Sequence, residues 1–218
     1  MVKAQKEVAF IGKITAGITH EMNNVLAIIK ESAGLMEDII SLFPENSIPH
    51  REKIQKSLAR IRAQIIRGVG LMESLNRFAH SPDESPAKVD LVVMAERMAT
   101  LSKRFIRQKN ADLIIRPQEK SDPPMTVVTH PVLLQMAIFE CILYCLDGMQ
   151  AGGNIRIEFE KTGEITTVKI LCGDGVADGI SSSERWQELE QIAGELKAVI
   201  ESDSSGQGIH LKLPERID

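Results

Sequence analysis

The sequence lacks an excess of positive charge and has few cysteines. Its 218 residues contain 26 Lys and Arg against 30 Asp and Glu, which gives a formal net charge of -4. Because affinity for the phosphate backbone of nucleic acids comes from clustered basic residues, we expect no nucleic-acid binding. Cys141, Cys145 and Cys172 lie inside apolar stretches, and their odd number and spacing favour neither a disulfide framework nor a zinc site. We expect three buried thiols in a reducing cytosol.

Long apolar runs and low-complexity segments are missing as well. No uninterrupted apolar run approaches the roughly 20 residues needed to span a bilayer, and the N-terminus has no signal-peptide pattern. Pro, Gly and Ser are not in excess, so the chain should fold. Four of the histidines have no Cys, Asp or Glu at metal-ligand spacing, namely His50, His80, His130 and His210. We therefore expect a cytoplasmic protein with no metal site and no membrane segment in this chain.

Two long amphipathic helices are predicted in the first 80 residues. Apolar residues recur at helical spacing from about residue 7 to 42 and again from 54 to 75, with a turn rich in helix breakers at 43–49. The apolar positions are Ile11, Ile14, Ile18, Met22, Val25, Ile29, Met36 and Ile39, then Ile54, Leu58, Ile61, Ile65, Val69, Met72 and Leu75. Because two such helices cannot bury their stripes fully against each other, we expect the hairpin to pair with a copy of itself in a dimeric four-helix bundle.

A polar linker with two prolines, Ser81 to Pro86, divides the sequence in two. Beyond it, helical patterns alternate with the patterns of short strands. The expected helices cover 89–106, 131–149 and 184–199, and the expected strands cover 111–116, 126–128, 154–160, 166–172 and 208–213. We predict an α+β protein with two domains, a helical hairpin at residues 1–81 and a mixed α/β domain at residues 88–218.

Helical geometry places His20 about 200° round the first helix from its apolar stripe, so this imidazole is predicted to be exposed. Glu21 could accept a hydrogen bond from one ring nitrogen and fix the tautomer, and Asn24 could orient a water molecule. The other interpretation is that His20 is merely solvated, which is the commoner state of a lone exposed histidine. The residues on the same face are small or short: Ala16, Gly17, Asn24, Ala27 and Gly34.

Residues 11–28, with the sequence Ile-Gly-Lys-Ile-Thr-Ala-Gly-Ile-Thr-His-Glu-Met-Asn-Asn-Val-Leu-Ala-Ile, closely resemble the phosphoacceptor motif of sensor histidine kinases. The resemblance implies that His20 accepts a phosphoryl group, that Glu21 acts as base, and that Asn24 assists dephosphorylation of a partner aspartate. Val25 stands where the family often has Pro. By the same resemblance, the rest of the chain is an α/β-sandwich of the histidine-kinase ATPase-like type, and the partner is the receiver domain of a response regulator.

The resemblance weakens at the nucleotide site. Residues 134–149 are similar to the family's nucleotide-site helix, but Glu140 and Tyr144 stand where that helix carries two Asn. The second Asn holds the magnesium that bridges the ATP phosphates, and Tyr is a poor replacement for such a compact oxygen ligand. Asp174 resembles the Asp of the adenine loop, although the glycines around it are displaced, and residues 181–186 lead almost directly into a helix where the family has a lid. We therefore expect no ATP and no magnesium as cofactors.

Three functions are compatible with this pattern. The first is a histidine phosphotransferase, in which His20 carries a phosphoryl group to or from a response-regulator aspartate and the ATPase-like domain is a docking surface. The second is an active sensor histidine kinase with a divergent site, which would use ATP and magnesium. The third is a response-regulator phosphatase or a non-catalytic binding partner, favoured by Asn24 and the small-residue face. The second helix could attract an acidic receiver domain, or simply present a solvated face, through Arg51, Lys53, Lys56, Arg60, Arg62 and Arg67.

Overall fold

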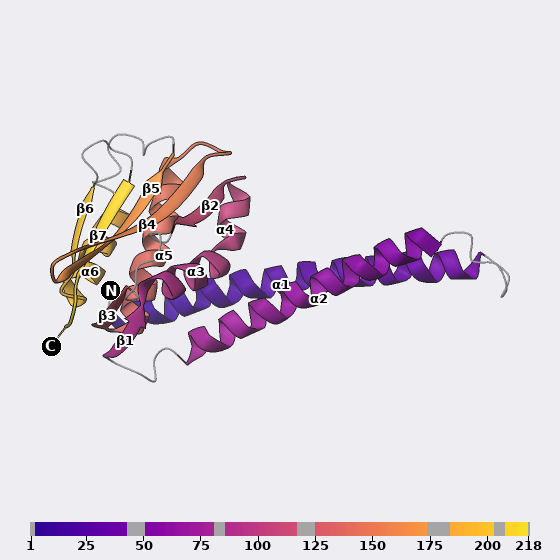
Figure 1. Ribbon diagram of the computed structural model, residues 1–218, viewed down its shortest axis with the longest axis horizontal. Coiled ribbons are helices and arrows are strands. Elements are labelled where there is room, and N and C mark those ends of the chain that lie inside the picture. The colour runs from indigo at the N-terminus through magenta and orange to yellow at the C-terminus, as the bar shows by residue number, and fades with distance from the viewer. Residues whose placement is uncertain are drawn as a thin grey trace.

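Two long helices form an antiparallel hairpin that projects from the rest of the protein (Figure 1). The computed structural model describes residues 3–42, 51–80, 86–116, 125–173, 184–202 and 208–217. Helix α1 covers Lys3–Ser41 and helix α2 covers Arg51–Ala79, so both predicted long helices are confirmed. The turn predicted between them, at 43–49, lies outside the described residues.

The rest of the described chain forms two sheets and four shorter helices. The larger sheet has the strand order β2-β4-β5-β7-β6, in which β2 and β4 run parallel and the other neighbours antiparallel, and β1 pairs antiparallel with β3 in a smaller sheet. The strands are β1 Ala87–Asp90, β2 Asp112–Arg116, β3 Thr126–Thr129, β4 Asn154–Thr162, β5 Ile165–Cys172, β6 Val199–Ser202 and β7 Gly208–Pro214. The helices are α3 Leu91–Leu101, α4 Lys103–Gln108, α5 Pro131–Gly148 and α6 Glu184–Glu195. The predicted α+β class is confirmed.

The larger sheet buries one face beneath helices α3, α5 and α6 (Figure 1). Side chains alternate between the two faces of a strand, so every second residue of β4 and β5 enters the core. Helix α5 is the one described helix long and apolar enough to cross a membrane, but 83 % of it is buried inside the protein, as expected of a core helix. The inward residues of the two central strands are Ile155, Ile157, Phe159, Val168, Ile170 and Cys172.

The helix predicted over 89–106 begins later and is interrupted. Residues 87–90 pair with β3 instead, and the carboxylate of Asp90 caps α3 by accepting hydrogen bonds from the backbone N–H groups of Val92 and Val93 at 2.9 and 3.1 Å. The helix ends at Leu101, and the short helix α4 begins after Ser102. The sequence pattern was therefore wrong about the first strand, because four residues are too few to show an alternation.

The helix predicted over 184–199 is also shorter than expected. Helix α6 ends at Glu195, and Lys197 has a φ of 52°, in the left-handed region that a continuing helix cannot use. Residues 199–202 then form β6, which pairs with β7 at the edge of the larger sheet. Of the apolar residues after Glu195 that suggested further helix, Leu196 is buried in the core and Val199 belongs to this edge strand.

One hydrophobic core joins the base of the hairpin to the α/β part. Phe10 of α1 makes edge-to-face ring contacts with Phe78 of α2 and with Phe139 of α5, and each pair of ring centroids is 5.4 Å apart. Phe105 of α4 contacts Phe139 in the same way at 5.5 Å, and Ile14 of α1 is fully buried among them. The α/β part is therefore packed onto the hairpin. The division into two domains stays a prediction.

All three cysteines are free and buried, as predicted. Burial raises the pKa of the Cys141 thiol above its ordinary value of 9.0, and a hydrogen bond with Cys172 together with burial raises the pKa of Cys145. The thiol of Cys145 also donates to the carbonyl oxygen of Ile170 at 3.9 Å. These thiols therefore contribute to the core as small apolar groups.

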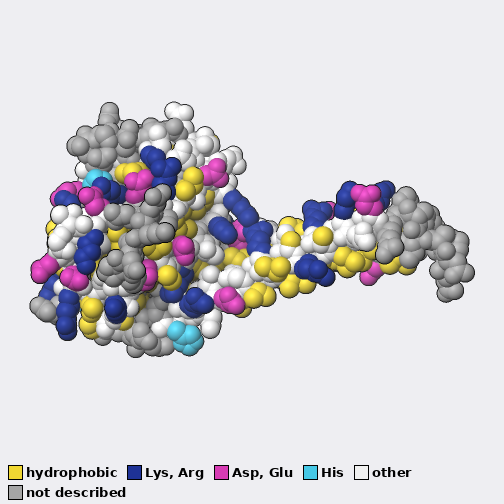
Figure 2. Space-filling model, viewed as in Figure 1, with side chains coloured by type: hydrophobic (Ala, Val, Ile, Leu, Met, Phe, Trp, Pro, Cys, Tyr) yellow, Lys and Arg dark blue, Asp and Glu magenta, His cyan; other side chains and the backbone are white. Residues whose placement is uncertain are grey.

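The outer part of the hairpin exposes apolar side chains, which form the yellow surface along it in Figure 2. The two helices approach closely at Gly68 of α2, where a Cβ would lie 3.3 Å from Cγ1 of Val25 on α1. The contact between α1 and α2 occupies one side of each helix, and the opposite side of each is exposed to solvent. We define the exposed apolar surface of the hairpin as Leu26, Leu35, Ile40, Leu42, Leu58, Ile65, Ile66, Val69 and Met72, each between 49 and 75 % exposed.

Candidate functional site

His20 lies near the middle of α1, and its side chain is exposed, as predicted. Asn24 lies one turn further along the helix and is half-buried. Its amide nitrogen Nδ2 is 3.3 Å from the ring nitrogen Nδ1 of His20. Residues four apart lie on the same side of a helix, which is why the two side chains meet. The structure thus brings together two of the three predicted site residues.

The amide of Asn24 can select the ring tautomer of His20. When Nδ2 faces Nδ1, the amide donates the hydrogen bond and the proton of the neutral ring resides on Nε2. After a half rotation of the amide, Oδ1 accepts a hydrogen bond from a protonated Nδ1, and Nε2 keeps its lone pair. In that second arrangement, Nε2 is the nucleophilic atom.

Glu21 lies on the neighbouring side of α1 and is only 3 % exposed. Its carboxylate accepts hydrogen bonds from Arg107 of α4 at 2.8 and 3.1 Å, and it also accepts one from Arg67 of α2. Successive residues of a helix point about 100° apart, so Glu21 faces the junction with α4 while His20 faces outward. In this arrangement, the carboxylate of Glu21 is bound to two guanidinium groups instead of His20, and its role as a base stays a prediction.

Gly17 allows α4 to come close to α1. It is buried, and a Cβ at this position would lie 3.7 Å from the ring of Phe105. The sequence pattern grouped Gly17 with Ala16 and Ala27 on the open face around His20, but the structure places it on the side covered by the α/β part. The small-residue face beside His20 is therefore narrower than predicted, and the close neighbour of Gly17 belongs to the same chain.

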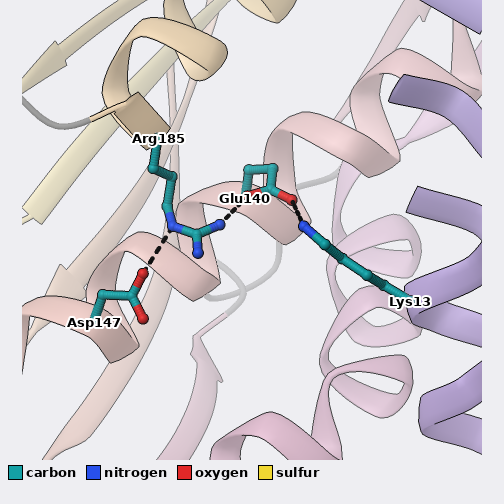
Figure 3. A network of polar contacts seen from close by, with 4 residues as sticks. All are labelled: Lys13, Glu140, Asp147 and Arg185. Carbon is teal, nitrogen blue, oxygen red and sulfur yellow. Dashed lines mark hydrogen bonds and ion pairs between the residues drawn. The ribbon is translucent and has the colours of Figure 1, made fainter. Parts of the chain in front are cut away.

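Glu140 of α5 lies at the centre of a network of ion pairs (Figure 3). Its carboxylate, in a residue only 4 % exposed, accepts a hydrogen bond from Nζ of Lys13 on α1 at 3.4 Å and another from Arg185 of α6. The Nε atom of Arg185 also donates to Asp147 at 2.9 Å. A buried carboxylate loses most of its hydration energy, and ion pairs with such partners compensate for that loss. The network links α1, α5 and α6 at the position where the resemblance expects the first Asn of a nucleotide site.

Tyr144, at the second of these positions, is buried against Trp186 of α6. The two ring centroids are 5.5 Å apart at an interplanar angle of 53°. Burial raises the pKa of the Tyr144 phenol, with smaller contributions from the neighbouring cysteines, so the hydroxyl stays protonated at neutral pH. A neutral phenol covered by an indole is a poor ligand for magnesium.

Parts of the predicted nucleotide region lie outside the described residues. These are Asp174 and residues 181–183 of the shortened loop. Within the described ranges, no three His, Cys, Asp or Glu side chains come close enough together to hold a metal ion.

Sequence reasoning missed the cations that engage the two buried carboxylates. Lys13 is 127 residues from Glu140 along the chain, and Arg107 is 86 residues from Glu21. Nothing local in the sequence marks such a pair. Arg67 was expected to belong to a solvated or partner-binding helix face, yet only 24 % of its side chain is exposed and it binds Glu21.

No protein-family model and no curated protein matches the sequence. Among solved structures, the chain is similar to a nucleotide-free catalytic domain of the histidine kinase ThkA, with 13 % identity and a TM-score of 0.51 over 61 % of this chain and 98 % of that one. A second nucleotide-free form gives 13 % identity and a TM-score of 0.50 over 60 % and 95 %. The likeness to the Acinetobacter baumannii histidine kinase AdeS covers 90 % of this chain and 98 % of that one, at 16 % identity and a TM-score of 0.48.

The likeness to ThkA shows the fold. The α/β part has the fold of a histidine kinase catalytic domain, and a long helical hairpin precedes it in the chain. The expected fold class, a long helical hairpin followed by an α/β domain of this type, is therefore confirmed, and the dimeric four-helix bundle stays a prediction. At 13 % identity, the activity has to be argued from the residues themselves.

Proposed function

We propose that this chain is a phosphorelay protein of two-component signalling, in which His20 carries a phosphoryl group to or from an aspartate of a response regulator. The observation that supports this most is the pairing of an exposed His20 with Asn24, at 3.3 Å, on the long helix of a chain with a histidine kinase fold. A merely solvated histidine requires neither the amide neighbour nor this fold. Together they favour the carrier over the solvated side chain.

The proposed reaction needs only the imidazole as nucleophile. The ring nitrogen with the free lone pair attacks the phosphorus of an aspartyl phosphate, so a nitrogen–phosphorus bond forms while the bond from phosphorus to the acyl oxygen breaks. The aspartate leaves as a carboxylate, and the other ring nitrogen keeps its proton. Asn24 would hold that proton through Oδ1. The reverse reaction would return the phosphoryl group to a second aspartate.

In this proposal Glu21 positions the helix that carries the ring. While Arg67 and Arg107 bind its carboxylate, Glu21 holds α1 against α2 and α4. It would act as a base towards His20 only after a side-chain rotation that releases both guanidinium groups. A phosphorylated ring that keeps its second proton is cationic, and the carboxylate would stabilise it after that rotation.

We propose that the phosphoryl group does not come from ATP. The carboxylate of Glu140 would repel the phosphates of a nucleotide and is already bound by Lys13 and Arg185, while Tyr144 is covered. The carboxylate of Glu140 is thus engaged by two cations, and the covered phenol of Tyr144 is not the compact oxygen ligand for magnesium that the resemblance implies. The donor would be another phosphorylated protein, and the α/β part would contribute to docking. Labelling of His20 by ATP would instead support an active kinase.

The proposal includes a second copy of this chain. On α1, Leu26, Ala33 and Ile40 are spaced by seven residues, and so are Leu58, Ile65 and Met72 on α2. A spacing of seven is that of helices packed side by side in a bundle. A dimer would cover the exposed apolar surface of the hairpin, which a single chain leaves in water.

The contact between Asn24 and His20 also favours a phosphatase activity towards the regulator. An amide at this position could orient a water molecule towards an aspartyl phosphate bound beside the ring. If the rate of regulator dephosphorylation is the same with the Asn24→Ala and Asn23→Ala variants as with the unaltered chain, this second activity is excluded.

The experiment that tests the proposal is a relay assay with purified proteins. A receiver domain phosphorylated on its aspartate is mixed with the full chain and then with a second receiver domain. We expect transfer with the unaltered chain and with a His80→Gln variant, and no transfer with His20→Gln. Normal relay by His20→Gln would refute the proposal.

A further inference from the structure

An open groove of about 370 Å³ lies where the end of α2 meets β1 and α3. It is away from the pair His20 and Asn24, none of whose atoms line it. Its polar lining contains four basic side chains, those of Arg77, His80, Lys88 and Arg97, together with Asn76 and the acidic Asp90. The groove is therefore a candidate site for an anion.

The charge of Arg97 is weakly compensated within this groove. Its side chain is half-buried on α3, and no carboxylate among the described residues lies within ion-pairing distance of it. Its neighbour is a second guanidinium, that of Arg77, and burial together with this like charge lowers the pKa of Arg97. A partly desolvated guanidinium beside another cation is stabilised by any anion that enters.

The acidic residues nearby do not neutralise Arg97. Asp90 already accepts hydrogen bonds from the backbone N–H groups of Val92 and Val93 at the start of α3. A smaller adjoining hollow of about 180 Å³, also lined by Arg97, contains Glu73 and Glu96, but neither forms an ion pair with it. The positive charge of Arg97 thus remains available to a ligand.

We propose that the groove binds a small anion that carries a phosphate or carboxylate group, with Arg97 as its main ligand and Arg77 and Lys88 beside it. A guanidinium presents two parallel N–H donors that match two oxygens of either group. The anion would contact α2, β1 and α3 together, and so would add a further link between the hairpin and the α/β part. This inference concerns a small-molecule site and is independent of the function proposed for His20.

The test is calorimetric titration of the full chain with inorganic phosphate, with succinate, and with chloride at matched ionic strength. We expect one saturable site per chain for phosphate, for succinate or for both, and none for chloride. The Arg97→Gln variant should bind at least tenfold more weakly, and Lys88→Gln, on an exposed strand residue, should bind several-fold more weakly. A comparison of phosphate with succinate identifies which oxygen-bearing group the groove prefers.

Lys53→Gln is the matched control, because it removes one positive charge from the same long helix as Arg77 but about 36 Å away along the axis. It should bind as the unaltered chain does, and so should His20→Gln. Circular dichroism checks whether Arg97→Gln is folded. If it is not, anion binding by the Lys88→Gln variant tests the proposal. Absence of saturable binding to the unaltered chain, or equal weakening by Lys53→Gln and Lys88→Gln, would overturn the proposal.

Discussion

An ion pair between Glu21 and Arg107 joins the helix that carries His20 to helix α4. The carboxylate accepts hydrogen bonds at 2.8 and 3.1 Å from one guanidinium nitrogen of Arg107, and only 3 % of Glu21 is exposed. Arg67 binds the same carboxylate from α2, so three helices meet at one buried charge. The residue next to the candidate phosphoacceptor therefore has a structural role that can be measured separately from any chemistry.

Glu21→Gln should lower the free energy of unfolding by about 1–3 kcal/mol, because the amide keeps the shape of the side chain but leaves two guanidinium groups without their anion. Urea denaturation measures the change. Glu158→Gln is the control, since its partner Arg116 is 3.9 Å away and both side chains are partly exposed, so a loss below about 0.5 kcal/mol is expected. Equal losses in the two variants would contradict the role assigned to Glu21.

Glu140→Asn introduces the residue type that the resemblance to sensor histidine kinases implies at this position. The variant should lose about 1–3 kcal/mol of stability, because Lys13 and Arg185 lose their shared carboxylate. It should not gain nucleotide binding, since Tyr144 stays beneath Trp186. Denaturation and calorimetry with an ATP analogue in the presence of magnesium check both statements. Tight binding of the analogue by the unaltered chain or by the variant would support the hypothesis of an active kinase.

Replacing Ile65 and Met72 together by Lys should convert a dimer into a monomer. Both side chains are 50 % exposed in the single chain, so the fold of each hairpin should survive while the apolar surface between copies is lost. Sedimentation of the unaltered chain and the variant measures the mass, and the exposed Arg60→Gln on the same helix is the control. A monomeric unaltered chain at micromolar concentration would contradict the four-helix bundle.

The buried thiols make stability depend on pH in the alkaline range. Burial raises the pKa of Cys141 above its ordinary value of 9.0, so above about pH 9 the unfolded chain releases a proton that the folded chain retains. Stability is therefore fully present below about pH 9 and falls as the pH rises further. The decline, measured by urea denaturation at a series of pH values, should be shallower in Cys141→Ala. If stability declines as steeply with pH in Cys141→Ala as in the unaltered chain, groups other than Cys141 cause the decline.

The long helices and the exposure of His20 could be predicted because both depend on local periodicity. A stripe that repeats every three to four residues over 30 residues defines a helix and the direction in which each side chain points. The same geometry was too coarse for Gly17, which lies on the side of α1 that the α/β part covers. Which side is covered depends on α4, and no local pattern places that helix.

The strands β1 and β6 and the buried ion pairs could not be predicted, because their partners are distant in sequence. Each strand has four residues and exists through pairing with β3 or β7. The sequence shows that Glu140 departs from the Asn that the resemblance implies, but its bonds to Lys13 and Arg185 depend on how three helices pack. Tertiary contacts of this kind decide whether a buried charge is tolerated.

The most direct test of the central claim is to measure phosphate on His20 by mass spectrometry under neutral conditions, after the full chain is incubated with a phosphorylated receiver domain or with ATP and magnesium. We predict phosphorylated His20 in the first incubation and none in the second. Phosphorylation of His20 by ATP, or its absence after incubation with active phosphorylated receiver domains, would contradict the account.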